Sequence, residues 1–85
     1  MDRDEIESFI EETVTEEVKL PDDLDDGFIG IAADMEPPCA VYSIPRSIDS
    51  LIKGGMSRDD ATEWFHYNTL GSMQEGHPIY IETPE

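Results

Sequence analysis

The chain is poor in basic residues. Five lysines and arginines stand against 21 aspartates and glutamates in 85 residues, which gives a formal net charge of −16 at pH 7. Nucleic-acid binding depends mainly on lysine and arginine side chains that displace counterions from the phosphates. Anionic membrane surfaces attract proteins through the same two residue types. The shortage of bases therefore argues against direct binding to nucleic acid or to a membrane.

Cysteine and long apolar runs are also scarce. The single cysteine excludes an intramolecular disulfide framework and fits a reducing compartment. No apolar run approaches the roughly 20 residues of a transmembrane helix, and the acidic N-terminal residues lack the basic and hydrophobic regions of a signal peptide. We therefore expect a cytoplasmic protein, and 85 residues allow one small domain.

Recognisable catalytic and cofactor-binding motifs are missing as well. Cys39 lies in an apolar run, where a free cysteine usually packs as a small hydrophobic residue. His66 and His77 do not stand at a zinc-binding spacing, and the acidic loop at residues 22–27 lacks the pattern of a calcium-binding EF-hand. We therefore predict a protein that is not an enzyme, with no catalytic residues, no metal and no cofactor.

What the chain does contain is negative charge, concentrated near the N-terminus. Residues 2–26 hold twelve acids and two bases, a net charge of −10, whereas residues 27–85 hold nine acids and three bases, a net charge of −6. Apolar residues in the first stretch recur at the spacing of one helix face, namely Ile6, Phe9, Ile10, Val14 and Val18. The pattern predicts an amphipathic helix over residues 2–18 that ends before Pro21. Its neighbouring like charges disfavour an isolated helix, so the apolar stripe needs burial against its own domain or a partner.

The rest of the chain has the pattern of two strands, two helices and a final strand. FIGIAA at residues 28–33 and CAVYS at 39–43 have strand composition, and Gly30 favours a bulge or a close backbone approach. The short connection between the two runs favours an antiparallel hairpin. A short helix follows, with Pro45 in its first turn and Gly54-Gly55 at its end. Ser57 is expected to cap a further helix that ends at Gly71, and PIYI at 78–81 predicts a closing strand.

The order α-β-β-α-α-β predicts an α+β fold, a small two-layer domain with a three-stranded, mainly antiparallel sheet and helices on one face. We divide this domain into an acidic amphipathic helical arm and loop at residues 1–26 and a compact α+β unit at residues 27–85. In the second helix of the unit, Trp64 and Phe65 are expected in the core, and Tyr67 is expected to be partly exposed as a candidate partner contact.

Residues 27–81 resemble a widespread group of small, functionally uncharacterised proteins encoded by bacteriophages and prophages. The segments that carry the resemblance are FIGI at 28–31, AVY at 40–42, GMSRDDATEWF at 55–65, NTLG at 68–71 and PIYI at 78–81. The chain departs from the group at His66, where an acid is common, and at His77, where threonine is common, and the acidic arm has no counterpart. The resemblance implies this αβ fold and a phage or mobile-element origin, and it brings no known activity.

Three interpretations of the acidic surface stay open. In the first, carboxylates stand in for nucleic-acid phosphates and capture a basic groove on a host protein. A small phage-type accessory protein would thereby inhibit or modulate host machinery, as in anti-defence or host takeover. In the second, the apolar stripe of residues 2–18 docks on a partner groove or on a second copy, giving a homodimer. In the third, the acids reflect adaptation to high salt in a halophile.

We take the first interpretation forward, with a host protein of basic surface as the partner. The predicted partner-binding residues are Glu7, Glu11, Glu12, Glu16, Glu17, Asp22, Asp23, Asp25, Asp26 and Tyr67.

Overall fold

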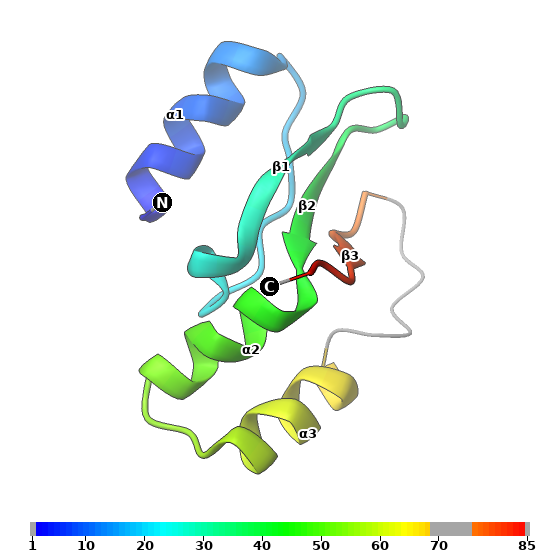
Figure 1. The fold of residues 1–85 in the computed structure, drawn as a ribbon. Helices are drawn as coiled ribbons and strands as arrows, with labels where there is room; N and C mark the ends of the chain where they lie inside the picture. The colour runs from blue at the N-terminus through cyan, green and yellow to red at the C-terminus, as the bar shows by residue number, and fades with distance from the viewer. Residues whose placement is uncertain (1, 69–75, 85) are drawn as a thin grey trace.

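The computed structural model describes residues 2–68 and 76–84, and the helix end expected at Gly71 lies outside them. Within the described residues, three helices and three strands follow the order α-β-β-α-α-β, which confirms the α+β fold (Figure 1). The elements are α1 (Arg3–Thr13), the 3-10 turn η1 (Asp25–Gly27), β1 (Phe28–Ala32), β2 (Cys39–Ser43), α2 (Ile44–Lys53), α3 (Arg58–Asn68) and β3 (Ile79–Ile81).

The sheet has the strand order β1-β2-β3, with β2 in the middle. β1 and β2 form the predicted antiparallel hairpin. Of the two predicted reasons for Gly30, the structure has the irregularity, a register shift between Phe28 and Gly30, and not the close approach, because nothing lies within 4 Å of a Cβ added at Gly30. β3 lies on the other edge of β2 and runs parallel to it, with Tyr80 opposite Tyr42. The sheet is therefore mixed rather than mainly antiparallel, because the chain passes through α2 and α3 before it returns beside β2.

α1 begins with a capping box and ends earlier than predicted. Asp2 Oδ1 accepts a hydrogen bond from the backbone N–H of Glu5 at 2.9 Å, and Glu5 Oε1 accepts one from the N–H of Asp2 at 3.1 Å. The last helical residue is Thr13, so the predicted extension to residue 18 is wrong. Val14 is already extended, with φ −134° and ψ 157°. Residues 13–15 are all β-branched and the last turn has no basic residue, so this helix end is poorly stabilised.

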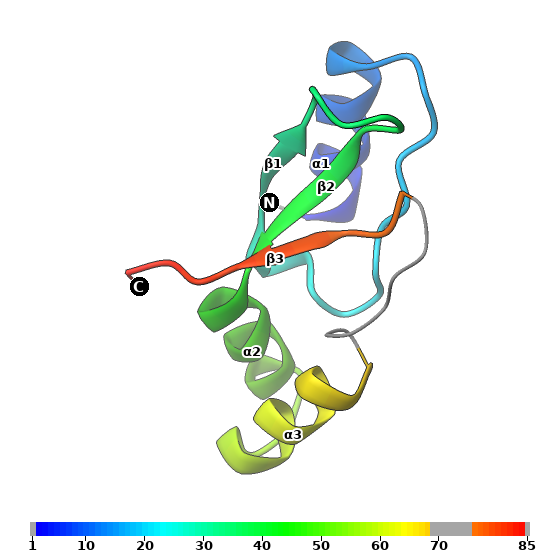
Figure 2. The same ribbon diagram turned by 90° about the vertical axis from the view of Figure 1, so that its right-hand side faces the viewer.

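α1 packs against the hairpin of its own chain. Ile6 is fully buried and Ile10 is 8% exposed, and both belong to the hydrophobic core that includes Phe28 and Tyr42. Figure 2 shows α1 behind the sheet, alongside the β1–β2 hairpin. The ring of Phe9 meets the ring of Phe28 edge-on at 6.1 Å between centroids. The apolar stripe of α1 is therefore buried mainly within its own domain.

α2 follows β2 without a loop. Ser43 is both the last residue of β2 and the N-cap of α2, and its Oγ accepts a hydrogen bond from the N–H of Arg46 at 3.3 Å. Pro45 lies in the first turn, as predicted. The helix ends at Lys53 with Gly54 as its C-cap, and the next residue, Gly55, has φ 118°, a conformation that favours glycine.

α3 packs on α2 and has the predicted cap. Ser57 Oγ accepts a hydrogen bond from the N–H of Asp60 at 3.2 Å. Phe65 is fully buried in the core, as expected, and Trp64 is only partly buried. Tyr67 is 83% exposed. The outward face of α3 therefore carries aromatic surface.

Candidate functional site

A surface groove lies between the second half of α1 and the segment that follows it. Residues 14–20 leave the end of α1 and turn back past the helix (Figure 1). The floor of the groove is apolar and consists of Ile10, Val14, Val18 and Leu20. Its rim carries four exposed glutamates, Glu7, Glu11, Glu16 and Glu17. None of the described residues that line this acidic groove is basic.

Arg3 fixes the segment that forms one wall of the acidic groove. Its Nη2 donates a hydrogen bond to the carbonyl oxygen of Pro21 at 2.8 Å, and its Nε donates one to Asp25 Oδ1 at 3.2 Å. Nη2 also lies 3.8 Å from Asp22 Oδ1. Because Arg3 lies in the first turn of α1 and Val14 lies at its end, residues 14–21 span the whole helix. The groove is thus held at both ends.

The acidic groove combines apolar contact with negative charge. Glu7 and Glu11 are one helical turn apart on α1, and Glu16 and Glu17 face the same apolar floor from the next segment. Thr15 Oγ1 donates a hydrogen bond to Glu16 Oε1 at 3.2 Å. Such a surface complements a segment with an apolar stripe flanked by lysine or arginine.

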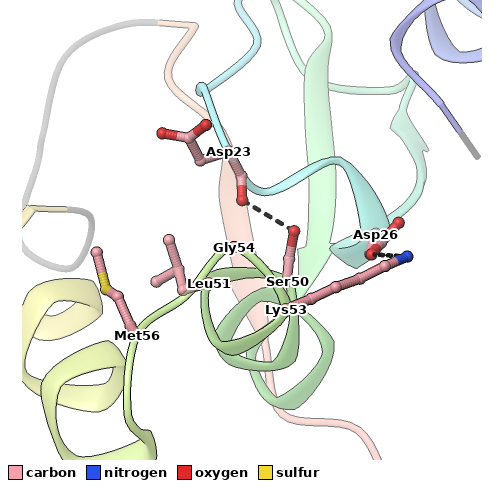
Figure 3. A pocket seen from close by; sticks show the side chains of 7 residues that line it. All are labelled: Asp23, Asp26, Ser50, Leu51, Lys53, Gly54 and Met56. Carbon is pink, nitrogen blue, oxygen red and sulfur yellow. Dashed lines mark hydrogen bonds and ion pairs between the residues drawn. The ribbon is translucent and has the colours of Figure 1, made fainter.

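Four predicted aspartates lie away from the acidic groove. Asp22 and Asp25 face Arg3, and Asp25 is held by it in an ion pair at 3.2 Å. Asp23 and Asp26 line a second hollow against α2, in which Lys53 extends to Asp26 with its Nζ 3.4 Å from Oδ2 (Figure 3). In this hollow the carbonyl oxygen of Asp23 accepts a hydrogen bond from Ser50 Oγ at 2.9 Å. The chain's own cations therefore engage three of these four carboxylates.

The two remaining predicted residues are also outside the acidic groove. Glu12 is exposed on α1 but does not line the groove. Tyr67 lies on α3, at the opposite end of the molecule from α1 (Figure 1). The structure thus brings together four of the nine predicted acids and leaves Tyr67 in a separate place.

Sequence reasoning missed the floor of the acidic groove. It assigned Val14 and Val18 to a continuing helix, in which they extend the stripe of Ile6 and Ile10. The helix break at Val14 moves them into a separate segment that faces α1. The β-branched run at residues 13–15 was the available signal for this break.

The described residues contain no group of three His, Cys, Asp or Glu side chains arranged to hold a metal ion. Cys39 is buried in the core region, and its Sγ lies 3.4 Å from the carbonyl oxygen of Pro37. None of the helices in the described part of the chain has the length and apolar character needed to cross a membrane.

Comparison of the chain with protein-family models, with curated proteins and with solved structures gives no match.

Proposed function

We propose that this chain binds a basic protein through the acidic groove beside α1. The observation that carries the proposal is the pairing of an apolar floor with four exposed glutamates and no basic lining residue among those described. A solvated acidic face that serves solubility alone needs no apolar strip between its carboxylates. A docking surface for an amphipathic basic segment needs both features.

The partner class that fits this surface is a protein whose own ligand is a nucleic acid. Five of the 11 residues of α1 are acidic, which at a rise of about 1.5 Å per residue gives one carboxylate per about 3.3 Å of axis. This spacing is close to the roughly 3.4 Å between charges along one strand of duplex DNA. A basic segment of the partner that is held in the acidic groove cannot contact nucleic acid at the same time, so binding would inhibit the partner. Because residues 27–81 resemble phage proteins, we propose that the target is a host protein in the cytoplasm. The chain would then act in anti-defence or in host takeover.

Long-range attraction supports fast association. The net charge of −16 steers a cationic partner toward the chain. The apolar floor of the groove then contacts the partner and slows its dissociation. Binding by charge alone fades within the Debye length as salt is added, whereas the apolar contact persists. We therefore expect binding that weakens with salt but keeps a preference for amphipathic ligands.

The test uses a synthetic lysine- and arginine-rich peptide designed as an amphipathic helix, and a scrambled peptide of the same composition. We expect the amphipathic peptide to bind at least about tenfold more tightly, which corresponds to about 1.4 kcal/mol. A variant with Gln at positions 7, 11, 16 and 17 should lose about tenfold in affinity. Duplex DNA should compete with the chain for a DNA-binding protein retained on it.

A matched control variant keeps the acidic groove and changes the same amount of charge elsewhere. Glu12→Gln, Asp34→Asn, Glu36→Gln and Glu82→Gln remove four exposed acids, so both variants have a net charge of −16 + 4 = −12. The control should bind the amphipathic peptide within about threefold of the unchanged chain. Equal weakening in both variants, or equal affinity for the scrambled peptide, would contradict a groove and leave only non-specific charge attraction.

A further inference from the structure

The outward face of α3 brings two acids and two aromatic rings together. Asp60, Glu63, Trp64 and Tyr67 stand at the three- and four-residue spacing of one helix face and line a shallow hollow with Asn68. The opposite face of α3 is buried through Ala61 and Phe65. The hollow is therefore built on a helix that the core holds in place.

The two aromatic rings are unequally anchored. Trp64 is partly buried and packs against the core. Tyr67 is 83% exposed one turn away. An aromatic ring in water is a typical anchor for a partner, because its burial releases a large apolar area at a small entropy cost.

The acids of this hollow, Asp60 and Glu63, have no ion-pair partner in the part of the chain that the structure describes. Arg58 is at the start of the same helix, but its Nη2 faces Asp49 Oδ1 at 3.5 Å, on the side of α2. Two carboxylates beside two aromatic faces attract a cation by charge and by the ring quadrupoles together.

We propose that this face of α3 is a receptor for an arginine side chain presented by a partner protein. A guanidinium is planar, so it stacks on Trp64 or Tyr67 while its N–H groups bond to the carboxylates of Asp60 and Glu63. A lysine ammonium is more strongly hydrated and has no plane to stack, so it fits less well. α3 lies at the opposite end of the molecule from α1 (Figure 1), and the receptor shares no lining residue with the acidic groove.

The chain supplies its own reporter, because Trp64 is its only tryptophan. The probes are three short, otherwise neutral peptides that carry one arginine, one lysine or one citrulline, which keeps the arginine shape without its charge. We expect the arginine peptide to shift the indole N–H resonance and the emission of Trp64 saturably, with a dissociation constant on the order of millimolar. The lysine peptide should bind at least about threefold more weakly, and the citrulline peptide should give no saturable change.

Variants separate the two components of the receptor. Tyr67→Ala should weaken arginine binding about threefold, and Asp60→Asn with Glu63→Gln about tenfold, because all three side chains are exposed and their loss should leave the core intact. The matched control, Asp59→Asn with Glu82→Gln, removes two exposed acids that do not line the hollow and should change affinity by less than twofold.

Several outcomes would overturn this receptor. They are equal binding of the citrulline peptide, equal binding of the lysine peptide, and an equal loss in the control variant. The variant with Gln at positions 7, 11, 16 and 17 should keep the full response of Trp64 to the arginine peptide. The affinity for the amphipathic peptide therefore tests the acidic groove, and the response of Trp64 to the arginine peptide tests the α3 receptor separately.

Discussion

The guanidinium of Arg3 joins the first turn of α1 to Asp25, three residues before β1, through a hydrogen bond of 3.2 Å from Nε to Oδ1. The same side chain holds the carbonyl oxygen of Pro21 at 2.8 Å. One of the few cations in the chain therefore fastens the first turn of α1 to the loop and 3-10 turn that lead into β1. α1 also meets the start of β1 through the edge-on contact of the Phe9 and Phe28 rings.

Replacement of Arg3 by alanine should destabilise the fold by about 1–2 kcal/mol, because the pair is partly covered and leaves a charged partner behind. The side chains of Arg3 and Asp25 are 33% and 29% exposed. The matched control is Lys53→Ala, whose side chain is 79% exposed in its pair with Asp26, and which should cost less than about 0.5 kcal/mol. Urea denaturation, monitored by tryptophan emission, measures the free energy of unfolding of both variants. An equal loss of stability in the two variants would contradict the fastening role of Arg3.

Replacement of Ile10 by aspartate should cost at least about 3 kcal/mol, because it places an unpaired charge in the core and removes a buried side chain. The matched control is Ser8→Asp, which adds the same charge at an exposed position of α1 and should cost about 1–2 kcal/mol, because four acids stand three or four positions away on the helix. Urea denaturation is again the measurement. Similar costs for the two variants would mean that α1 does not pack on its own hairpin.

Gly27 is expected to tolerate no side chain. A Cβ at this position would collide with Ser47 Oγ and lie 2.9 Å from the backbone nitrogen of Ser47, so Gly27→Ala should cost about 2–3 kcal/mol. Gly30 meets nothing within 4 Å of an added Cβ, and Gly30→Ala should change stability by less than about 0.5 kcal/mol. Thermal unfolding of both variants tests the difference, and an unchanged melting temperature for Gly27→Ala would contradict the close approach of η1 to α2.

Tyr42 should make the fold sensitive to alkaline pH. Burial, with the nearby negative charge of Asp25 as a second cause, raises the pKa of the Tyr42 phenol above its ordinary value. The unfolded chain therefore loses the phenolic proton at a lower pH than the folded chain. The free energy of unfolding keeps its full value below about pH 10 and falls as the pH rises above that value. Burial raises the pKa of Tyr80 as well and adds to the fall.

Tyr42→Phe provides the measurement. Stability determined between about pH 8 and about pH 11 should fall less steeply in this variant. At neutral pH the variant should be as stable as the unchanged chain or more so, because the Tyr42 hydroxyl is buried without a hydrogen-bond partner among the described residues. A loss above about 1 kcal/mol at neutral pH would show that the hydroxyl is bonded after all.

Local signals in the sequence predicted the elements that depend on neighbouring residues. The hairpin strands, the bulge near Gly30, Pro45 in the first turn of α2 and the Ser57 cap are all decided within a few residues. The parallel pairing of β3 with β2 was not predicted, because it depends on how α2 and α3 pack before the chain returns.

The candidate site was predicted in its charge but not in its shape. The acids of the N-terminal segment are visible in the sequence, but their division between the acidic groove and Arg3 depends on contacts between residues 18 to 22 positions apart. The partial exposure of Trp64 was missed, because Trp64 and Phe65 are neighbours on α3 and only the packing decides which one is buried.

Ser43 ends β2 and caps α2 in a single residue, so the chain has no hinge between the sheet and the helical pair. Its Oγ also lies 2.7 Å from Thr83 Oγ1, which ties the stretch after β3 to the same point. Such a junction restricts the movement of the sheet relative to the helical pair. A single target that engages both of them must therefore display its cations at a preset spacing, and a flexible target must give up entropy to match it.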